Sequence, residues 1–326
     1  MRKINDSVSK TSRGPLFFYS PGLMPYNVED HQATTKLRFP GVSITGSRCD
    51  LLCDHCNASL LEKMIHVKTP EELELVGKKI IRAGGTGLLV SGGSRADGSI
   101  PLKPFLPALT QLKKMNLVVV LHTGLVDRRL ASALSLSGVD AVLIDIIGDS
   151  STISEVCHLK KMVSDYERSL RFLKATGIKL VPHIVLGLHY GKIQGEYKAV
   201  EVIASVGVDA LVFVVLTPLK STTMAQVTPV SPEEARGVIR YARQKMAGTP
   251  MILGCARPRG PYSWALEKAC IEAGIRGIAF PSEQCVQFAK NRRYKIIWRD
   301  MCCSLLFQDL QTHNRQGVAA EHPFSV

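Results

Sequence analysis

Long apolar runs are missing from this chain of 326 residues. No stretch approaches the ~20 apolar residues that a membrane-spanning helix requires, which argues against a membrane protein. The charged N-terminus, residues 1–6, has no apolar segment behind it, so the sequence predicts no secretory signal. Aromatic residues make up only 6% of the chain and do not interleave with basic runs, which argues against a stacking site for nucleic acid.

Acidic residues are also few compared with basic ones. The chain has 28 Asp and Glu against 41 Lys and Arg, which gives a formal net charge of +13. A basic surface raises the local concentration of an anionic partner and accelerates encounter with it. An acidic carrier protein is one such partner; a well-solvated basic surface without a dedicated partner is the alternative.

Cysteines, in contrast, are frequent. Nine of them without a secretion signal indicate a reducing interior, so we expect a cytoplasmic protein. Three of the nine, Cys49, Cys53 and Cys56, fall within eight residues. An iron–sulfur cubane normally takes four thiolates, yet no fourth cysteine follows before Cys157. Three thiolates would leave one iron open to a small molecule.

Two other roles for these cysteines fit the sequence less well. Structural zinc needs two ligand pairs at short spacings, and only His55 lies near. A disulfide framework is not required in a chain long enough to build its own core, and an odd number of cysteines leaves one over. The spacing therefore favours an iron–sulfur cluster.

The pattern Cys49-x3-Cys53-x2-Cys56, with His55 just before the last cysteine, resembles the signature of radical S-adenosylmethionine (SAM) enzymes. The resemblance implies a [4Fe–4S] cluster whose unique iron is chelated by the amino and carboxylate groups of SAM. It further implies an electron donor such as ferredoxin or flavodoxin, cleavage of SAM to methionine and a 5′-deoxyadenosyl radical, and abstraction of hydrogen from an unactivated carbon.

Strand and helix patterns alternate along most of the chain, which indicates parallel βα units. The expected strands cover residues 39–45, 87–91, 117–122, 141–146, 179–187, 210–215, 251–255 and 277–280, with an extra one at 294–298. We predict an α/β fold, a (β/α)8 TIM-type barrel over residues 37–292. An irregular lead-in, residues 1–36, would precede it, and a C-terminal extension, residues 293–326, would fold over the barrel mouth. A partial six-unit barrel and a doubly wound open sheet are the alternatives.

Polar and glycine residues at the ends of three expected strands are candidates for binding SAM. Gly92-Gly93-Ser94 resembles the family's Gly-Gly-Glu, with serine in place of glutamate, and would meet the methionine end; an ordinary βα turn is the alternative. Asp145 could accept hydrogen bonds from ribose hydroxyls or orient the substrate, or could simply cap a helix. Gly187 resembles part of the fifth-strand motif that packs on adenine.

A second group of cysteines bears on the type of reaction. Cys255 ends the seventh strand, and Cys302 and Cys303 lie in the C-terminal extension. Together they could hold an auxiliary [4Fe–4S] cluster, since a vicinal pair seldom forms a disulfide. Arg257 would steady that cluster or bind substrate, or pair with a surface carboxylate.

Over nearly its whole length the chain resembles the biotin synthase-like branch of the family. Within this branch it resembles a sulfur-inserting subunit of the bipartite lipoyl synthases. That resemblance implies sulfur attachment to an octanoyl group on an acidic lipoyl carrier protein, together with a companion radical SAM subunit. A mutase or C–C lyase without a second cluster, and a non-catalytic iron–sulfur protein for electron transfer or scaffolding, remain as alternatives.

Overall fold

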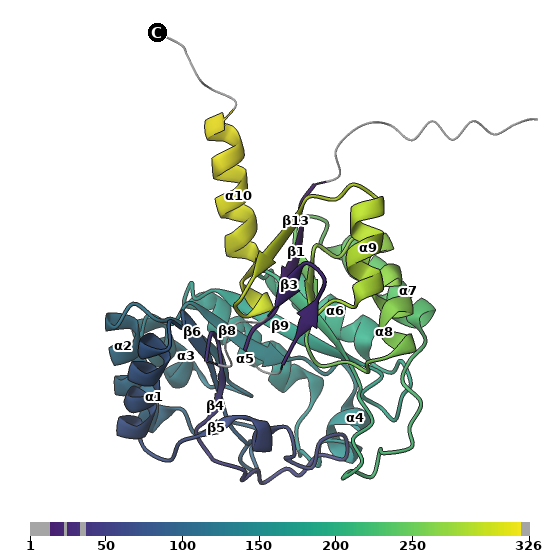
Figure 1. Ribbon diagram of the computed structural model, residues 1–326. Coiled ribbons are helices and arrows are strands. Elements are labelled where there is room, and N and C mark those ends of the chain that lie inside the picture. Colours follow the sequence, from purple (N-terminus) through teal and green to yellow (C-terminus); the bar gives the residue numbers. More distant parts are fainter. Residues whose placement is uncertain (1–13, 23–24, 33–36, 321–326) are drawn as a thin grey trace, which may run out of the picture.

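A computed structural model describes residues 14–22, 25–32 and 37–320 of the chain. Its central feature is a sheet of 11 strands in the order β13-β1-β12-β11-β10-β9-β8-β7-β6-β4-β5. All neighbouring strands of this sheet run parallel. The sheet curls, and most helices lie along its outer face (Figure 1). This arrangement confirms an α/β fold of the TIM type.

The strands of the main sheet are β1 (Leu16–Tyr19), β4 (Gly41–Ser43), β5 (Ile65–His66), β6 (Gly87–Ser91), β7 (Val118–His122), β8 (Ala141–Asp145), β9 (Leu180–Leu186), β10 (Leu211–Val215), β11 (Met251–Leu253), β12 (Gly277–Ala279) and β13 (Ile296–Arg299). A separate hairpin contains β2 (Asn27–Val28) and β3 (His31–Gln32). The α-helices are α1 (Pro70–Arg82), α2 (Leu106–Lys114), α3 (Arg128–Leu136), α4 (Ser150–Glu155), α5 (Val163–Ala175), α6 (Glu196–Val206), α7 (Pro232–Lys245), α8 (Pro261–Glu272), α9 (Glu283–Asn291) and α10 (Leu306–Ala320). The 3-10 helices are η1 (Leu61–Lys63), η2 (Lys103–Phe105) and η3 (Cys303–Leu305).

The curled sheet does not close. Its order begins at β13 and ends at β5, and these two edge strands do not pair within the described parts of the chain. The result is a half-barrel, whereas the sequence predicted a full barrel of eight units. The expected strands between residues 39 and 298 are all present, but β1 and β5 add to them. β5 contains only two residues, too few for a recognisable alternating pattern.

Part of the expected irregular lead-in is a strand. The four residues of β1, Leu16–Tyr19, are completely buried, and β1 pairs with both β12 and β13. The expectation was therefore wrong for this segment. Turn-forming residues at 14–15 and 20–22 flank a strand of only four residues, so the sequence pattern on either side indicated a loop. Lead-in residues 1–13, 23–24 and 33–36 lie outside the described residues.

The helices are positioned by apolar stripes and by caps at their first turns. Thr69 accepts a hydrogen bond from the backbone of Glu72 at the start of α1, and Ser231 and Glu234 form a capping box at the start of α7. The buried faces of the helices pack on the outward side chains of the strands in one large apolar cluster. No helix in the described part of the chain is long and apolar enough to cross a membrane.

The C-terminal segment fills the inside of the half-barrel. Leu305, Leu306 and Phe307 are buried in a second apolar cluster, together with inward-facing strand residues such as Val120 and Val212. α10 then leaves at the top of Figure 1, whereas α4, which follows β8, lies at the bottom. The extension thus packs inside the sheet rather than over its mouth, because its apolar residues gain most by burial against the concave face.

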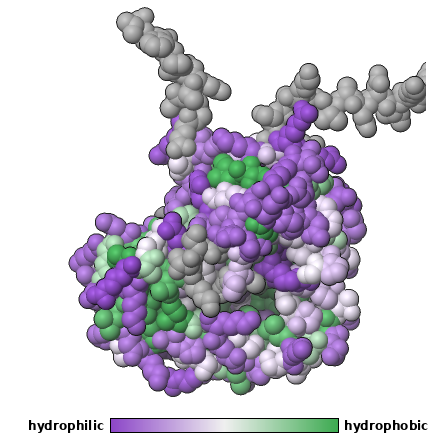
Figure 2. Space-filling model, viewed as in Figure 1, coloured by the Kyte–Doolittle hydropathy of each residue, from purple (hydrophilic) through white to green (hydrophobic). Residues whose placement is uncertain are grey.

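The face of the molecule drawn in Figure 2 is mostly hydrophilic. Figure 2 shows hydrophilic residues over most of one face, with hydrophobic residues gathered at its left, where α1 and β4 lie in Figure 1. Leu75 and Ile81 of α1 are among the exposed apolar side chains of the protein.

Candidate functional site

The three clustered cysteines lie on a tightly wound loop that follows β4. The backbone N–H of Cys56 donates to the carbonyl of Cys53 at 3.1 Å, and Asn57 N–H donates to the same carbonyl at 2.8 Å. Leu52, Asn57 and Ala58 have positive φ angles of 43°, 42° and 60°. Such conformations are uncommon outside glycine and mark a loop held in a specific shape.

This loop forms one wall of a cavity of about 300 Å³ at the carboxyl ends of the strands. The cavity is lined by all three cysteines, by Tyr166 of α5 and by residues at four other strand ends, among them Gly92, Gly93, Ser94, His122, Asp145, Val185 and Leu188. Four of the residues proposed from the sequence to bind SAM, Gly92, Gly93, Ser94 and Asp145, thus lie in the same cavity as the cysteines. Carboxyl strand ends are where parallel α/β barrels place their reactive groups.

Gly93 allows the strand after the loop to approach it closely. A Cβ atom at Gly93 would lie 2.0 Å from the carbonyl oxygen of Arg48 and 2.7 Å from Cα of Cys49. The backbone N–H of Gly93 donates to Thr45 Oγ1 at 2.7 Å, and Thr45 Oγ1 donates to the Arg48 carbonyl at 2.9 Å. The absence of a side chain at Gly93 thus fixes the position of the first cysteine.

We expect Gly93→Ala to displace the cysteine loop. The new methyl group would overlap backbone atoms, and overpacking of this kind costs about 1–3 kcal/mol. Iron bound after anaerobic reconstitution should fall well below the wild-type value, while the protein stays folded by circular dichroism. Gly248→Ala is the matched control, because a Cβ there meets nothing within 4 Å. Normal iron content in Gly93→Ala would show that the close approach is not needed.

Asp145 closes β8 and lies in a group with two histidines. His122 Nε2 lies 3.7 Å from Asp145 Oδ1, and the rings of His122 and His183 are 5.5 Å apart. Half of the Asp145 side chain is accessible, and it faces the enclosed cavity. Burial would raise the pKa of Asp145, but His122 and His183 lower it to about 2. The carboxylate is therefore ionised and able to accept hydrogen bonds.

Gly187 lies in a turn behind the cavity wall. It has a φ of +77°, and its N–H donates to Glu196 Oε1 at 2.7 Å. Its neighbours Val185 and Leu188 line the cavity. Contact between Gly187 and adenine therefore stays a prediction, and Glu196 is the residue that sets the shape of this turn.

Asp54 anchors the cysteine loop from outside and was not singled out in the sequence. Its carboxylate accepts a hydrogen bond from the Tyr190 hydroxyl at 2.7 Å and lies 3.1 Å from His158 Nε2. Burial opposes ionisation of Asp54, but these partners lower its pKa overall. Tyr190 lies in the loop after β9, and His158 lies in the loop after α4. Asp54 therefore links the cysteine loop to both of these loops.

The second group of cysteines is brought together at the end of β11 and the start of η3. A hydrogen bond with Cys303, stronger than the opposing effect of burial, lowers the pKa of Cys302 to about 7. The charges of Cys255 and Cys302 influence each other, and His122 interacts electrostatically with Cys302. None of these three cysteines lines the 300 Å³ cavity, which His122 does. His122 thus lies between the two groups.

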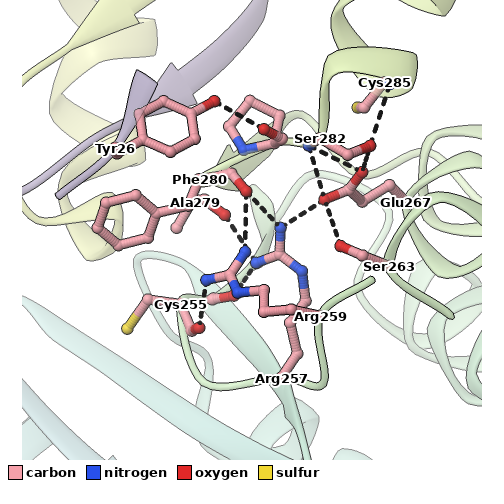
Figure 3. A network of polar contacts seen from close by, with 12 residues as sticks. Tyr26, Cys255, Arg257, Arg259, Ser263, Glu267, Ala279, Phe280, Ser282 and Cys285 are labelled. Carbon is pink, nitrogen blue, oxygen red and sulfur yellow. Dashed lines mark hydrogen bonds and ion pairs between the residues drawn. The ribbon is translucent and has the colours of Figure 1, made fainter. Parts of the chain in front are cut away.

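Arg257 occupies a structural position. It donates to Glu267 Oε1 at 2.6 Å, and both side chains are fully buried. Its other hydrogen bonds go to three backbone carbonyls, those of Gly254, Ala279 and Phe280. Figure 3 shows the Cys255 sulfur pointing away from the guanidinium group of Arg257. A direct role for Arg257 at a cluster or substrate stays a prediction, and the observed contacts connect β11, α8 and β12.

The segment that contains the loop and most of the cavity matches a known family. Residues 43–194 match the Radical SAM superfamily. The match begins in β4, includes the three cysteines of the loop and continues past β9. This segment is a radical SAM domain. A search of curated proteins finds no match to the chain.

The fold around the radical SAM domain is similar to that of several solved structures. HydG, a maturase of the [FeFe]-hydrogenase, matches with a TM-score of 0.58 and 15% identity over 82% of this chain, which spans 56% of HydG. Methylornithine synthase (PylB) matches with a TM-score of 0.54 and 14% identity over 75% of this chain and 72% of PylB. Streptococcus suis SuiB bound to its precursor peptide SuiA matches with a TM-score of 0.53 and 14% identity over 83% of this chain and 61% of SuiB. At such identities the likeness concerns the fold alone.

A radical SAM domain implies a [4Fe–4S] cluster and SAM, and the residues of this domain fit both. Cys49, Cys53 and Cys56 face one cavity, and a hydrogen bond with Cys53 together with burial raises the pKa of Cys56 to about 12. Cluster binding must therefore release protons. Among the described residues no three acidic, Cys or His side chains converge on a single ion position. A cubane has a separate iron for each thiolate, so its ligands need not converge on one point.

The radical SAM domain does not extend to every residue proposed from the sequence. It includes the SAM-binding candidates Gly92, Gly93, Ser94, Asp145 and Gly187. Cys255, Arg257, Cys302 and Cys303 lie beyond it. The family match therefore says nothing about an auxiliary cluster or a sulfur-inserting reaction, which would involve residues after 194.

Proposed function

We propose that this chain is a radical SAM enzyme in which Cys49, Cys53 and Cys56 hold the [4Fe–4S] cluster and SAM occupies the adjoining cavity. The observation that carries the proposal is the shared cavity, where the three thiols face the 92–94 turn and Asp145. When bound, the cluster supplies the electron that cleaves SAM into methionine and a 5′-deoxyadenosyl radical.

The side chains of the cavity would bind and orient SAM. The turn at residues 92–94 brings backbone polar groups next to the cysteine loop, where the amino acid end of SAM would lie. The ionised carboxylate of Asp145 would accept hydrogen bonds from the ribose hydroxyls, with His122 fixing its orientation. Tyr166 and Leu188, both almost fully buried, would cover the site and keep water from the radical.

We further propose that the reaction inserts sulfur into an octanoyl group on an acidic lipoyl carrier protein. The proximity of Cys255, Cys302 and Cys303 supports this idea, because three thiolates could hold a second [4Fe–4S] cluster. That cluster would be a substrate, consumed as the source of sulfur. A hydrogen atom would pass from the octanoyl carbon to the adenosyl carbon. A sulfide of the second cluster would then form a C–S bond with the carbon radical, one electron would pass to an iron of that cluster, and the Fe–S bonds of that sulfide would break. A companion radical SAM subunit and an electron donor would complete the system.

The experiment that tests sulfur insertion replaces Cys255, Cys302 and Cys303 together with alanine. The variant should lose roughly half of its iron if both clusters are cubanes, yet still form 5′-deoxyadenosine. It should form no thiolated product from an octanoylated carrier. Alanine at Cys270 and Cys285, two buried cysteines of α8 and α9, is the matched control and should leave the iron content unchanged.

Full wild-type iron content in the triple variant would show that these cysteines are not ligands. The second candidate function, a mutase or C–C lyase with one cluster, would then be favoured. Its support at present is the Cys49–Cys56 loop alone, which all radical SAM reactions share.

A further inference from the structure

A groove lies on the outside of the radical SAM domain, directly beside the cysteine cavity. It has a volume of about 500 Å³ and lies between residues 95–106, α3 and α5. Its floor is apolar and includes Ile100, Leu102, Leu106, Leu125, Val126, Leu130 and Phe172. Ile100 and Leu125 also line the cysteine cavity, so one layer of side chains separates the two.

Cations without ion-pair partners surround this apolar floor. Arg95, Lys103 and Arg129 are exposed on the rim, and Lys161 lies beside them. None of the four forms a salt bridge with any residue that the structure describes. Burying these side chains against neutral surface would be costly, whereas a negatively charged surface would satisfy them.

The acidic side chains of the groove are already engaged. Asp97 accepts hydrogen bonds from the backbone and hydroxyl of Ser99, and Asp127 accepts one from the first turn of α3. Asp165 accepts from the backbone of Met162 and pairs with Arg168. These bonds fix the three carboxylates in place without removing their charge, but five Lys and Arg side chains line the groove against three Asp, so its net charge is positive. A neighbouring depression adds Arg128, whereas Arg171 on its wall is paired with Glu167.

We propose that this groove is the docking site for the acidic face of the carrier protein that delivers the substrate. The inference rests on the proposed function and adds the surface at which the carrier binds. Cations without a salt bridge lie on three separate segments, the loop after β6, η2 and α3, and suit a folded acidic surface more than a small anion. The apolar floor suits the nonpolar side chains at the centre of a protein interface. The shared wall places a docked carrier next to the cavity where its acyl group must react.

Other anionic partners fit the groove less well. Nucleic acid would be expected to stack on aromatic side chains, but Phe172 is the only ring of the groove and Arg128 lies over it at 5.5 Å. A membrane surface would be expected to receive exposed apolar side chains, whereas the apolar residues here form the floor.

The test is a charge reversal with a matched control. The groove variant carries Arg95→Glu, Lys103→Glu and Arg129→Glu. The control carries Arg240→Glu, Lys268→Glu and Arg292→Glu, which changes the net charge equally on α7, α8 and the end of α9. Binding of a purified octanoylated lipoyl carrier domain is measured by isothermal calorimetry at low and physiological salt. Circular dichroism confirms that both variants are folded.

We expect the groove variant to bind the carrier at least about tenfold more weakly, while the control stays within about twofold of wild type. Wild-type affinity should also fall with salt, because a Debye length of about 8 Å at physiological ionic strength screens the rim charges. Equal binding by the groove variant and wild type would overturn the docking site. A second result would also overturn it: wild-type protein binds a DNA oligonucleotide or phosphatidylserine vesicles but not the carrier, and the groove substitutions abolish that binding.

Two results distinguish an incorrect docking site from an incorrect proposed function. Wild-type protein that forms 5′-deoxyadenosine but binds the carrier through another surface contradicts the docking site alone. Wild-type protein that forms none contradicts the proposed function, whatever the carrier does.

Discussion

Alanine at Cys49, Cys53 and Cys56 is expected to abolish formation of 5′-deoxyadenosine while leaving the protein folded. All three side chains line the cavity, and they are the thiol ligands that we propose for the cluster. Without them the proposed cluster would lose its thiol ligands, and SAM would have no iron to contact. The loop is shaped mainly by backbone hydrogen bonds and by Asp54. The thiols add only a hydrogen bond between Cys53 and Cys56 and a long contact of 3.7 Å from Cys53 Sγ to the Cys157 carbonyl, so we expect the variant to stay folded.

This prediction is checked by chromatography of reactions that contain SAM and dithionite under anaerobic conditions. Product should fall below detection in the triple variant, and iron should fall by about four atoms per chain, the number in one cubane. Cys270→Ala serves as the control for loss of a cysteine, because Cys270 is buried in α8 away from the loop. Product formed by the triple variant at the wild-type level would show that iron is held elsewhere.

Glu267→Ala is expected to destabilise the fold by about 3–5 kcal/mol, because it leaves the Arg257 charge buried and unpaired. Glu267 also accepts hydrogen bonds from the Ser263 hydroxyl at 3.0 Å and from the backbone and hydroxyl of Ser282. Removing its carboxylate would leave all of these donors without a partner, as the network in Figure 3 shows.

Urea unfolding measures this loss. Glu233→Ala is the matched control, since Glu233 forms an exposed pair with Arg236, and such pairs contribute about 0–1 kcal/mol. A loss below about 1 kcal/mol in Glu267→Ala would contradict the structural role of the pair. If the loss is as large as expected, low activity of any Arg257 variant would first have to be separated from misfolding.

The strands that contain five or more residues could be predicted from the sequence. Val118–His122 and Leu211–Val215 are apolar runs bounded by turns, and parallel strands of this kind are buried on both faces. β1 could not be predicted, because it pairs with residues about 260 positions away in β12 and about 280 positions away in β13. Whether the curled sheet closes or stays open also depends on pairing between residues far apart in the sequence. The alternation of strands and helices gives the fold type but not the contact between the last strand and the first.

The candidate site could be predicted where residues follow strand ends. Gly93 and Asp145 lie in the cysteine cavity because parallel strands bring their carboxyl ends to one edge of the sheet. The same argument applies to His122, the last residue of β7, but a single histidine in an apolar run carried no signal by itself. Arg257 was assigned from its position next to Cys255. Its actual partner, Glu267, lies on the following helix, and only the folded chain shows that the two are buried together.

The central claim is that the chain generates a radical from SAM, and the most direct test is the product formed by the wild-type protein. The protein is reconstituted anaerobically with iron and sulfide and incubated with SAM and dithionite, and 5′-deoxyadenosine and methionine are then quantified. We predict that both appear together, and only when reductant and SAM are present. Protein that contains the full cubane iron but leaves SAM intact would contradict the claim and favour a non-catalytic iron–sulfur protein.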